Sequence, residues 1–151
     1  MSLRFRFVPI PTGRPVISLG GRHTRPRPLI PVTLVGPSGS VLLDAVVDTA
    51  ADDTVFSEIA AANIGLDLTT APTGTAMGVG GGVSAVRYAE VGLQLTDGQE
   101  RREWKGWVGF TSAKFRYPML GFAGCLQFFD TLLRGAAEEV ELTVNTLYPG
   151  T

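Results

Sequence analysis

The segment Asp44–Ser57, DAVVDTAADDTVFS, decides how this sequence is interpreted. An apolar run, Ala45 to Val47, ends directly in Asp48, and small residues with two further acids follow it. Such an apolar run predicts a buried strand, so the Asp48 carboxylate is expected at the strand end, beside desolvated backbone. The small residues after it permit a tight turn and the close approach of another group. The segment therefore predicts a carboxylate displayed at the end of a buried strand.

A carboxylate at a strand end also has a purely structural explanation. Aspartate often accepts hydrogen bonds from the backbone of the turn that follows it. Asp52 and Asp53 are further acceptors nearby, placed to hold backbone N–H groups of a ligand. The local pattern leaves both explanations open, and the rest of the chain has to distinguish them.

Alternating apolar and polar residues predict strands on both sides of this segment. LRFRFV near the N-terminus is one strand, and LIPVTLVG at 29–36 is another. PSGS at Pro37–Ser40 is a turn, after which VLLDAVVD returns as a strand to Asp48. The predicted helix is SEIAAANIGL, because Ser57 can cap its start and Gly65 can end it.

The second half of the chain also favours extended structure. Residues 73–95 are predicted to form two extended segments around a glycine cluster, Gly78 to Gly82. REWKGWVGF at 102–110 is a further predicted strand. YPMLGFAGCLQFF is predicted as a strand running into one helical turn, and TLLRGAAEEVELTVN as a closing hairpin. The chain is therefore expected to be mostly β, with one or two short helices.

The Pro- and Arg-rich segment TGRPVISLGGRHTRPRP, at 12–28, is predicted to be a loop with one short strand around Val16 to Leu19. Its arginines either bind an acidic partner or belong to a solvated loop. Residues 1–27 are expected to belong to the same domain as residues 28–151, because 151 residues suit one domain with one core.

Composition narrows the class of protein. Hydrophobic residues make up 44% and charged residues 18%, which is typical of a globular chain, and the net charge of -1 does not favour a nucleic-acid partner. The single cysteine, Cys125, excludes an intramolecular disulfide and is expected to be buried. One Cys and one His make a poor zinc site, so no metal or cofactor is expected.

The sequence contains neither a signal-peptide pattern nor an apolar run of roughly 18 residues, the length of a membrane span. No membrane association is therefore expected, and the predicted location is the cytoplasm.

The segment VVDTAADDTV resembles the active-site segment of retropepsin-like aspartic proteases, in which apolar residues precede Asp-Thr/Ser-Gly-Ala. Three further segments resemble that family in the same order. PLIPVTLVG resembles the preceding strand, AMGVGGGVSAVRY the glycine-tipped flap, and YPMLGFAG the segment that supports the active-site loop. Together they cover roughly Pro28 to Phe129. On local evidence the glycine cluster is also compatible with a plain hairpin tip, but it lacks the endings of the phosphate-binding loops.

The resemblance implies a single-domain, retropepsin-like acid-protease β-barrel that hydrolyses peptide bonds as an aspartic endopeptidase. Because the chain has one Asp-Thr-Ala segment, the second carboxylate would come from a second copy, which implies a homodimer acting on a peptide or protein substrate. The implied catalytic residues are Asp48 and Thr49, the latter bracing the pair across the two-fold axis. The implied substrate-binding residues are Ala50, Asp52, Asp53, Met77, Gly78, Val79, Gly80 and Gly81.

Two residues depart from the family pattern. Ala50 stands where glycine is usual, and Phe122 stands where the viral members carry an arginine that pairs with an acid near the active site. Three interpretations therefore remain: the homodimeric endopeptidase, a peptide-binding module on the same fold with weak or no cleavage, and an unrelated small β-barrel in which Asp48 is structural.

Overall fold

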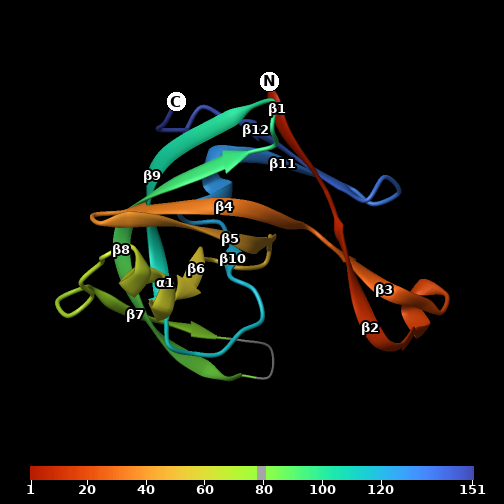
Figure 1. Ribbon diagram of the computed structural model, residues 1–151, viewed down its shortest axis with the longest axis horizontal. Coiled ribbons are helices and arrows are strands. Elements are labelled where there is room, and N and C mark those ends of the chain that lie inside the picture. Colours follow the sequence, from red (N-terminus) through yellow and green to blue (C-terminus); the bar gives the residue numbers. More distant parts are fainter. Residues whose placement is uncertain (78–80) are drawn as a thin grey trace.

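A closed, six-stranded mixed β-barrel forms the body of the molecule. The computed structural model describes residues 1–77 and 81–151. The main sheet has the order β4-β5-β10-β6-β9-β8-β7, and an additional pairing of β4 with β8 closes the barrel (Figure 1). Its strands are β4 Leu29–Gly36, β5 Gly39–Val47, β6 Val55–Ser57, β7 Thr73–Met77, β8 Val83–Thr96, β9 Arg101–Thr111 and β10 Met119–Leu120. The sequence-based prediction of a mostly β, barrel-type fold is confirmed.

The short strand β10 is what makes the barrel mixed. It lies between β5 and β6, parallel to the first and antiparallel to the second. Consequently the segment that follows β5 and the segment that follows β10 emerge at the same end of the barrel. This arrangement brings two loops distant in sequence together around Asp48.

The apolar alternation seen in the sequence is the inner face of the barrel. Ile30, Val32 and Leu34 of β4 are fully buried, and so is Ala45 of β5. The helix α1, Glu58–Asn63, covers part of the barrel and begins as predicted, with the Ser57 hydroxyl accepting from the Ile59 N–H at 3.1 Å. It ends at Asn63 with Ile64 as its C-cap, and the next residue, Gly65, has a left-handed φ of 78°, which favours glycine.

A second, three-stranded sheet joins the two ends of the chain. It consists of β1 Ser2–Arg6, β12 Glu139–Val144 and β11 Phe129–Arg134, in that order, all antiparallel. The predicted closing hairpin is therefore present. The first and last strands of the chain, β1 and β12, are thus direct neighbours in this sheet.

The prediction of a loop at residues 12–28 was wrong for most of that segment. β2 Val8–Val16 and β3 Arg22–Arg27 form an antiparallel hairpin, joined through a 3-10 turn at Ile17–Leu19, where only a short strand was expected. Proline normally argues against a strand because it cannot donate to the ladder, but a two-stranded ribbon has only edge strands, where proline is tolerated. We call this hairpin, residues 8–27, the arm; Figure 1 shows it projecting from the barrel.

Candidate active site

Asp48 lies immediately after β5, at the end of the barrel where β10 runs beside that strand. Its backbone N–H donates to the Leu120 carbonyl at 3.0 Å. The preceding residue, Val47, is buried and donates to the Pro28 carbonyl at 2.9 Å. Asp48 itself is half-buried. The strand end predicted from sequence is thus fixed from both sides by backbone hydrogen bonds.

The Asp48 side chain is held by the turn that it begins. Its Oδ1 accepts from the Ala50 N–H at 3.0 Å, and its carbonyl accepts from the Ala51 N–H at 3.2 Å. The Thr49 and Ala50 side chains are exposed. One carboxylate oxygen is therefore oriented by the protein backbone, an arrangement compatible with both a structural and a catalytic role.

Ala50 occupies the glycine position of the family pattern without backbone strain. Among the described residues that are not glycine, only Glu138 has a positive φ. Ala50 is thus in a conformation that an L-residue adopts freely, and its methyl group points into open surroundings. The departure from the family pattern at this position is accommodated within the single chain.

The segment Gly121–Ala123 lies against the Asp48 loop and supports it. Phe122 N–H donates to the Ala51 carbonyl at 2.9 Å, and Ala123 N–H donates to the Asp52 carbonyl at 2.9 Å. A methyl group at Gly121 would collide with the carbonyl oxygen of Asp53, so only glycine permits this close approach. This arrangement matches the supporting role that the resemblance implied for the YPMLGFAG segment.

Thr54 connects the Asp48 loop to the Gly121–Ala123 segment by hydrogen bonds. It is fully buried, and its hydroxyl accepts from the Gly121 N–H at 3.2 Å and donates to the Gly121 carbonyl at 3.3 Å. Its own carbonyl accepts from Gly109 of β9 at 2.8 Å. The hydroxyl fixes the loop because it is the acceptor for the buried Gly121 N–H, whereas the Gly121 carbonyl also accepts from the Leu126 N–H at 3.0 Å.

The two acids that follow the loop have different environments. Asp52 is exposed, and among the described residues no hydrogen bond or ion pair reaches its carboxylate. Asp53 Oδ2 instead accepts from the Tyr88 hydroxyl at 2.8 Å. Burial, together with this hydrogen bond and the Asp53 charge, raises the pKa of Tyr88 to about 12. Asp52 and Asp53, which the sequence analysis assigned together to substrate binding, therefore differ in burial and in hydrogen bonding.

Tyr88 is a site residue that the sequence analysis missed. It lies on β8 and is paired with Gly109 of β9, while its ring covers Gly74 of β7. A methyl group at Gly74 would lie 2.7 Å from the Tyr88 ring, so the glycine makes room for it. Nothing in the local pattern around Tyr88 indicates this contact, because Asp53 lies 35 residues away.

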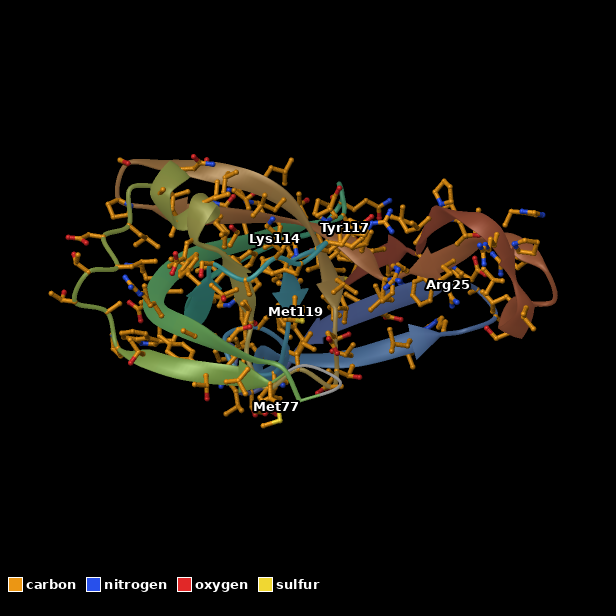
Figure 2. The ribbon with its side chains drawn as sticks, turned by 90° about the horizontal axis from the view of Figure 1, so that it is seen from below. Arg25, Met77, Lys114, Tyr117 and Met119 are labelled. Carbon is orange, nitrogen blue, oxygen red and sulfur yellow. The ribbon has the colours of Figure 1, made fainter. Side chains whose placement is uncertain are left out.

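The predicted flap is an antiparallel hairpin of β7 and β8, in which Met77 pairs with Val83. Both side chains are exposed, 76% for Met77 and 63% for Val83, and Figure 2 shows Met77 at the margin of the molecule. Gly81 is exposed with a φ of 82°. The remaining predicted flap residues, Gly78, Val79 and Gly80, lie outside the described residues.

The described residues provide neither a metal-binding cluster nor a reactive cysteine. Within residues 1–77 and 81–151 no group of three or more His, Cys, Asp or Glu side chains is arranged to hold a metal. Burial raises the pKa of the Cys125 thiol to about 12, so it is an inert core residue and not a nucleophile. In the same part of the chain, none of the helices has the length and apolar character needed to cross a membrane.

Comparison with known proteins identifies the fold. No protein-family profile matches the sequence, and no curated protein matches it significantly. Among solved structures, a retropepsin-like aspartic protease from Rickettsia conorii is similar over 94% of this chain and 93% of its own, with a TM-score of 0.50 and 14% identity. The chain therefore has a retropepsin-like fold, as the sequence resemblance implied.

Proposed function

We propose that the protein is an aspartic endopeptidase that acts as a homodimer, with Asp48 from each chain at the two-fold axis. The observation that carries this proposal is the position of Asp48. In a retropepsin-like barrel, it stands at the end of a strand whose last inward-facing residues, Ala45 and Val47, are buried, with one carboxylate oxygen oriented by the Ala50 N–H. The close contact of Gly121 with the backbone of Asp53, together with the Thr54 hydroxyl, holds the loop that carries this carboxylate in place.

A second chain is needed because one chain supplies one suitable carboxylate. Two other Asp-Thr pairs occur in the chain. In Asp53-Thr54, the carboxylate accepts from the Tyr88 hydroxyl and the threonine is fully buried. Asp130-Thr131 lies within the β11–β12 ladder, where Asp130 is paired with Thr143, and it is followed by two leucines and not by small residues. A two-fold axis beside Asp48 would instead bring two identical loops together, which is the usual symmetry of homodimers.

The two carboxylates would activate a water molecule without a metal or a covalent intermediate. Two carboxylates about 3 Å apart do not both ionise readily, so they share one proton and titrate as a unit. The ionised group accepts a proton from water, and that water attacks the peptide carbonyl carbon. The protonated group donates its proton to the carbonyl oxygen, and a proton then passes to the leaving nitrogen.

Neighbouring residues would bind and cover the substrate. Thr49 would brace the pair by a hydrogen bond across the axis, while Ala50, Asp52 and Asp53 would contact the substrate backbone. The flap residues Met77, Gly78, Val79, Gly80 and Gly81 would close over the peptide and exclude water. The free carboxylate of Asp52 makes it the better placed of the two acids to accept substrate N–H groups.

An inactive or weakly active peptide-binding module is the second candidate. It is favoured by β7, which is the edge strand of the main sheet and can pair with an extended peptide through its free backbone groups. Such a module would use the Asp48 loop and the β7–β8 hairpin for binding but would not hydrolyse what it binds.

Peptide-library cleavage by the purified protein from about pH 3 to 7, alongside Asp48→Asn, tests the proposal. We expect cleavage by the wild type and none by the variant, which retains the size and most hydrogen bonds of the side chain. Circular dichroism and thermal unfolding of both proteins show whether they are equally folded. A folded, dimeric wild type that binds peptides but cleaves none would favour the binding module.

A further inference from the structure

The arm is the least explained part of the molecule. Its two strands pair only with each other in the described part of the chain. One ion pair ties it to the body, between Arg22 of the arm and Glu138 of the β11–β12 turn, at 2.7 Å. A two-stranded hairpin alone is at best marginally stable in water. A projecting ribbon of this kind gains stability when a further surface packs against it.

The arm has the opposite charge to the body. Residues 8–27 contain four arginines and no Lys, Asp or Glu, which gives +4, whereas the rest of the chain contains nine Lys or Arg and fourteen Asp or Glu, which gives -5. The overall net charge of -1 conceals this separation. Within the described residues, Arg22 is the one arm arginine that forms an ion pair with a carboxylate.

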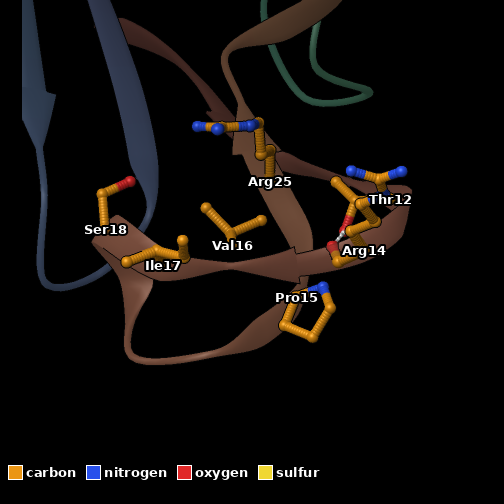
Figure 3. Close-up of a pocket in the computed structure, with 7 residues that line it drawn as sticks. All are labelled: Thr12, Arg14, Pro15, Val16, Ile17, Ser18 and Arg25. Carbon is orange, nitrogen blue, oxygen red and sulfur yellow. Dashed lines mark hydrogen bonds between the residues drawn. The ribbon is translucent and has the colours of Figure 1, made fainter.

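The exposed surface of the arm combines cations with apolar side chains. Arg14 and Arg25 lie beside an open hollow that Val16 and Ile17 also line (Figure 3). Ile17 is 94% exposed, the highest value among the exposed large hydrophobic residues of the described chain. A surface of this composition suits a protein partner with acidic groups around an apolar contact, because interfaces combine an apolar centre with a polar rim and are enriched in arginine.

The prolines of the arm indicate how such a partner is held. Pro9, Pro11, Pro15 and Pro26 lie in or beside the paired positions of β2 and β3. Proline has no N–H to offer to an added strand, so it blocks extension of the ribbon at an edge. The arm is therefore built to contact a surface through its side chains rather than to capture an extended peptide by strand addition.

The arm leaves the barrel next to the candidate active site. Pro28, at its base, accepts a hydrogen bond from Val47, the residue before Asp48, at 2.9 Å. In Figure 1 the arm extends outward from the side of the barrel at which β5 ends. A second copy that brought its own Asp48 to this position would have its body beside the arm. The nine residues of β2 span about 30 Å, whereas the radius of gyration of a domain of this size is about 15 Å. The arm is therefore long enough to reach across the body of the second copy.

We infer that the arm binds the acidic body of a second copy of this chain and holds the active homodimer together. This inference rests on the homodimer of the proposed function. Exposed carboxylates available on the body include Asp44 on β5 and Glu90 on β8, neither of which forms an ion pair within the described residues. The arm would thus add a contact between subunits outside the Asp48 loops.

Sedimentation analysis of the double variant Arg14→Glu/Arg25→Glu tests this inference. A two-fold dimer uses each arm once per chain, so four charges are reversed at the interface. We expect the dimer dissociation constant to rise by roughly tenfold or more, with a weaker dependence on salt than in the wild type. The conservative variant Arg14→Lys/Arg25→Lys should keep the dimer, because it keeps the charges.

The matched control is Arg101→Glu/Lys105→Glu, which makes the same change of net charge on exposed positions of β9 in the body. It should leave the dimer dissociation constant within about twofold of the wild type. Thermal unfolding of each variant separates a weakened dimer from a misfolded chain. The proteins are compared without substrate, so the result does not depend on catalysis.

An unchanged dissociation constant and salt dependence in the arm variant would overturn the inference. Stronger binding of wild type than variant to anionic lipid vesicles or single-stranded DNA, with dimerisation unaffected, would likewise assign the arm to another partner. A wild type that is dimeric through its arm but cleaves no peptide would overturn the proposed function and leave this inference standing. Conversely, peptide cleavage by the arm variant that recovers at high protein concentration would support both.

Discussion

The Tyr88 hydroxyl links the flap hairpin to Asp53 through a single hydrogen bond of 2.8 Å. We expect Tyr88→Phe to lower the free energy of unfolding by about 1 kcal/mol, because it leaves a half-buried carboxylate oxygen without its donor. Denaturant unfolding near pH 7 measures this change. Tyr117→Phe, at a position for which no hydroxyl hydrogen bond is found among the described residues, is the control and should be nearly neutral. Equal effects of the two substitutions would contradict the importance of the Asp53 contact.

The same residue predicts how stability depends on alkaline pH. Burial first, and then Asp53, raise the pKa of Tyr88 to about 12 from its ordinary value of 10.0. Because the folded-state pKa is the higher one, the stabilisation is complete below about pH 10 and is lost as the pH rises toward about 12. Stability should therefore fall more steeply between these values in the wild type than in Tyr88→Phe. Parallel curves would show that Tyr88 titrates normally.

Substitution of Gly121 tests whether the Asp48 loop depends on the Gly121–Ala123 segment that supports it. Gly121→Ala should lower the free energy of unfolding by about 3 kcal/mol or displace the loop, since the added methyl group meets the Asp53 carbonyl. Gly135→Ala is the matched control, because a methyl group there has no neighbour within 4 Å. Chemical denaturation and peptide cleavage of both variants measure the effect. A fully stable and active Gly121→Ala protein would disprove the tight fit.

At the scale of elements, the flap hairpin exposes apolar side chains that have no packing role within the chain. Replacing Met77, 76% exposed, with Ser should raise KM, or the peptide Kd if cleavage is absent, by about fivefold with little change in Tm. Leu42→Ser is the control, since Leu42 is 67% exposed on β5. Calorimetric peptide titration measures both. A similar loss of affinity in the control would show that the effect does not come from the flap.

Most elements were predictable because their signal is local. The β4–β5 hairpin follows from alternating apolar residues around the Pro37–Ser40 turn, and Asp48 stands out because it ends an apolar run. The arm was missed because its prolines suggested a loop, although they are tolerated on the edges of a two-stranded ribbon. The Tyr88–Asp53 contact was missed for a different reason: it depends on the registers of β8, β9 and β6, which no single segment encodes.

At the scale of the whole molecule, the chain supplies half of the site that it is proposed to form. The barrel presents Asp48 at one end, and the basic arm departs from the same end. A net charge close to zero conceals the two oppositely charged parts. The proposed homodimer accounts for both features, and it leads to a prediction that depends on subunit stoichiometry rather than on any single contact.

Mixing the wild type with Asp48→Asn at a constant total concentration distinguishes a shared site from a complete one. If both carboxylates are required, a mixed dimer is inactive, and equal amounts should give about one quarter of the wild-type activity once subunits have exchanged. If each chain carries its own complete site, the activity should be about one half. Asp130→Asn, which alters the Asp-Thr pair within the β11–β12 ladder, is the control and should leave the mixture fully active. A linear fall in activity with the Asp48→Asn fraction would mean that Asp48 acts within one chain and that no two-fold catalytic pair exists.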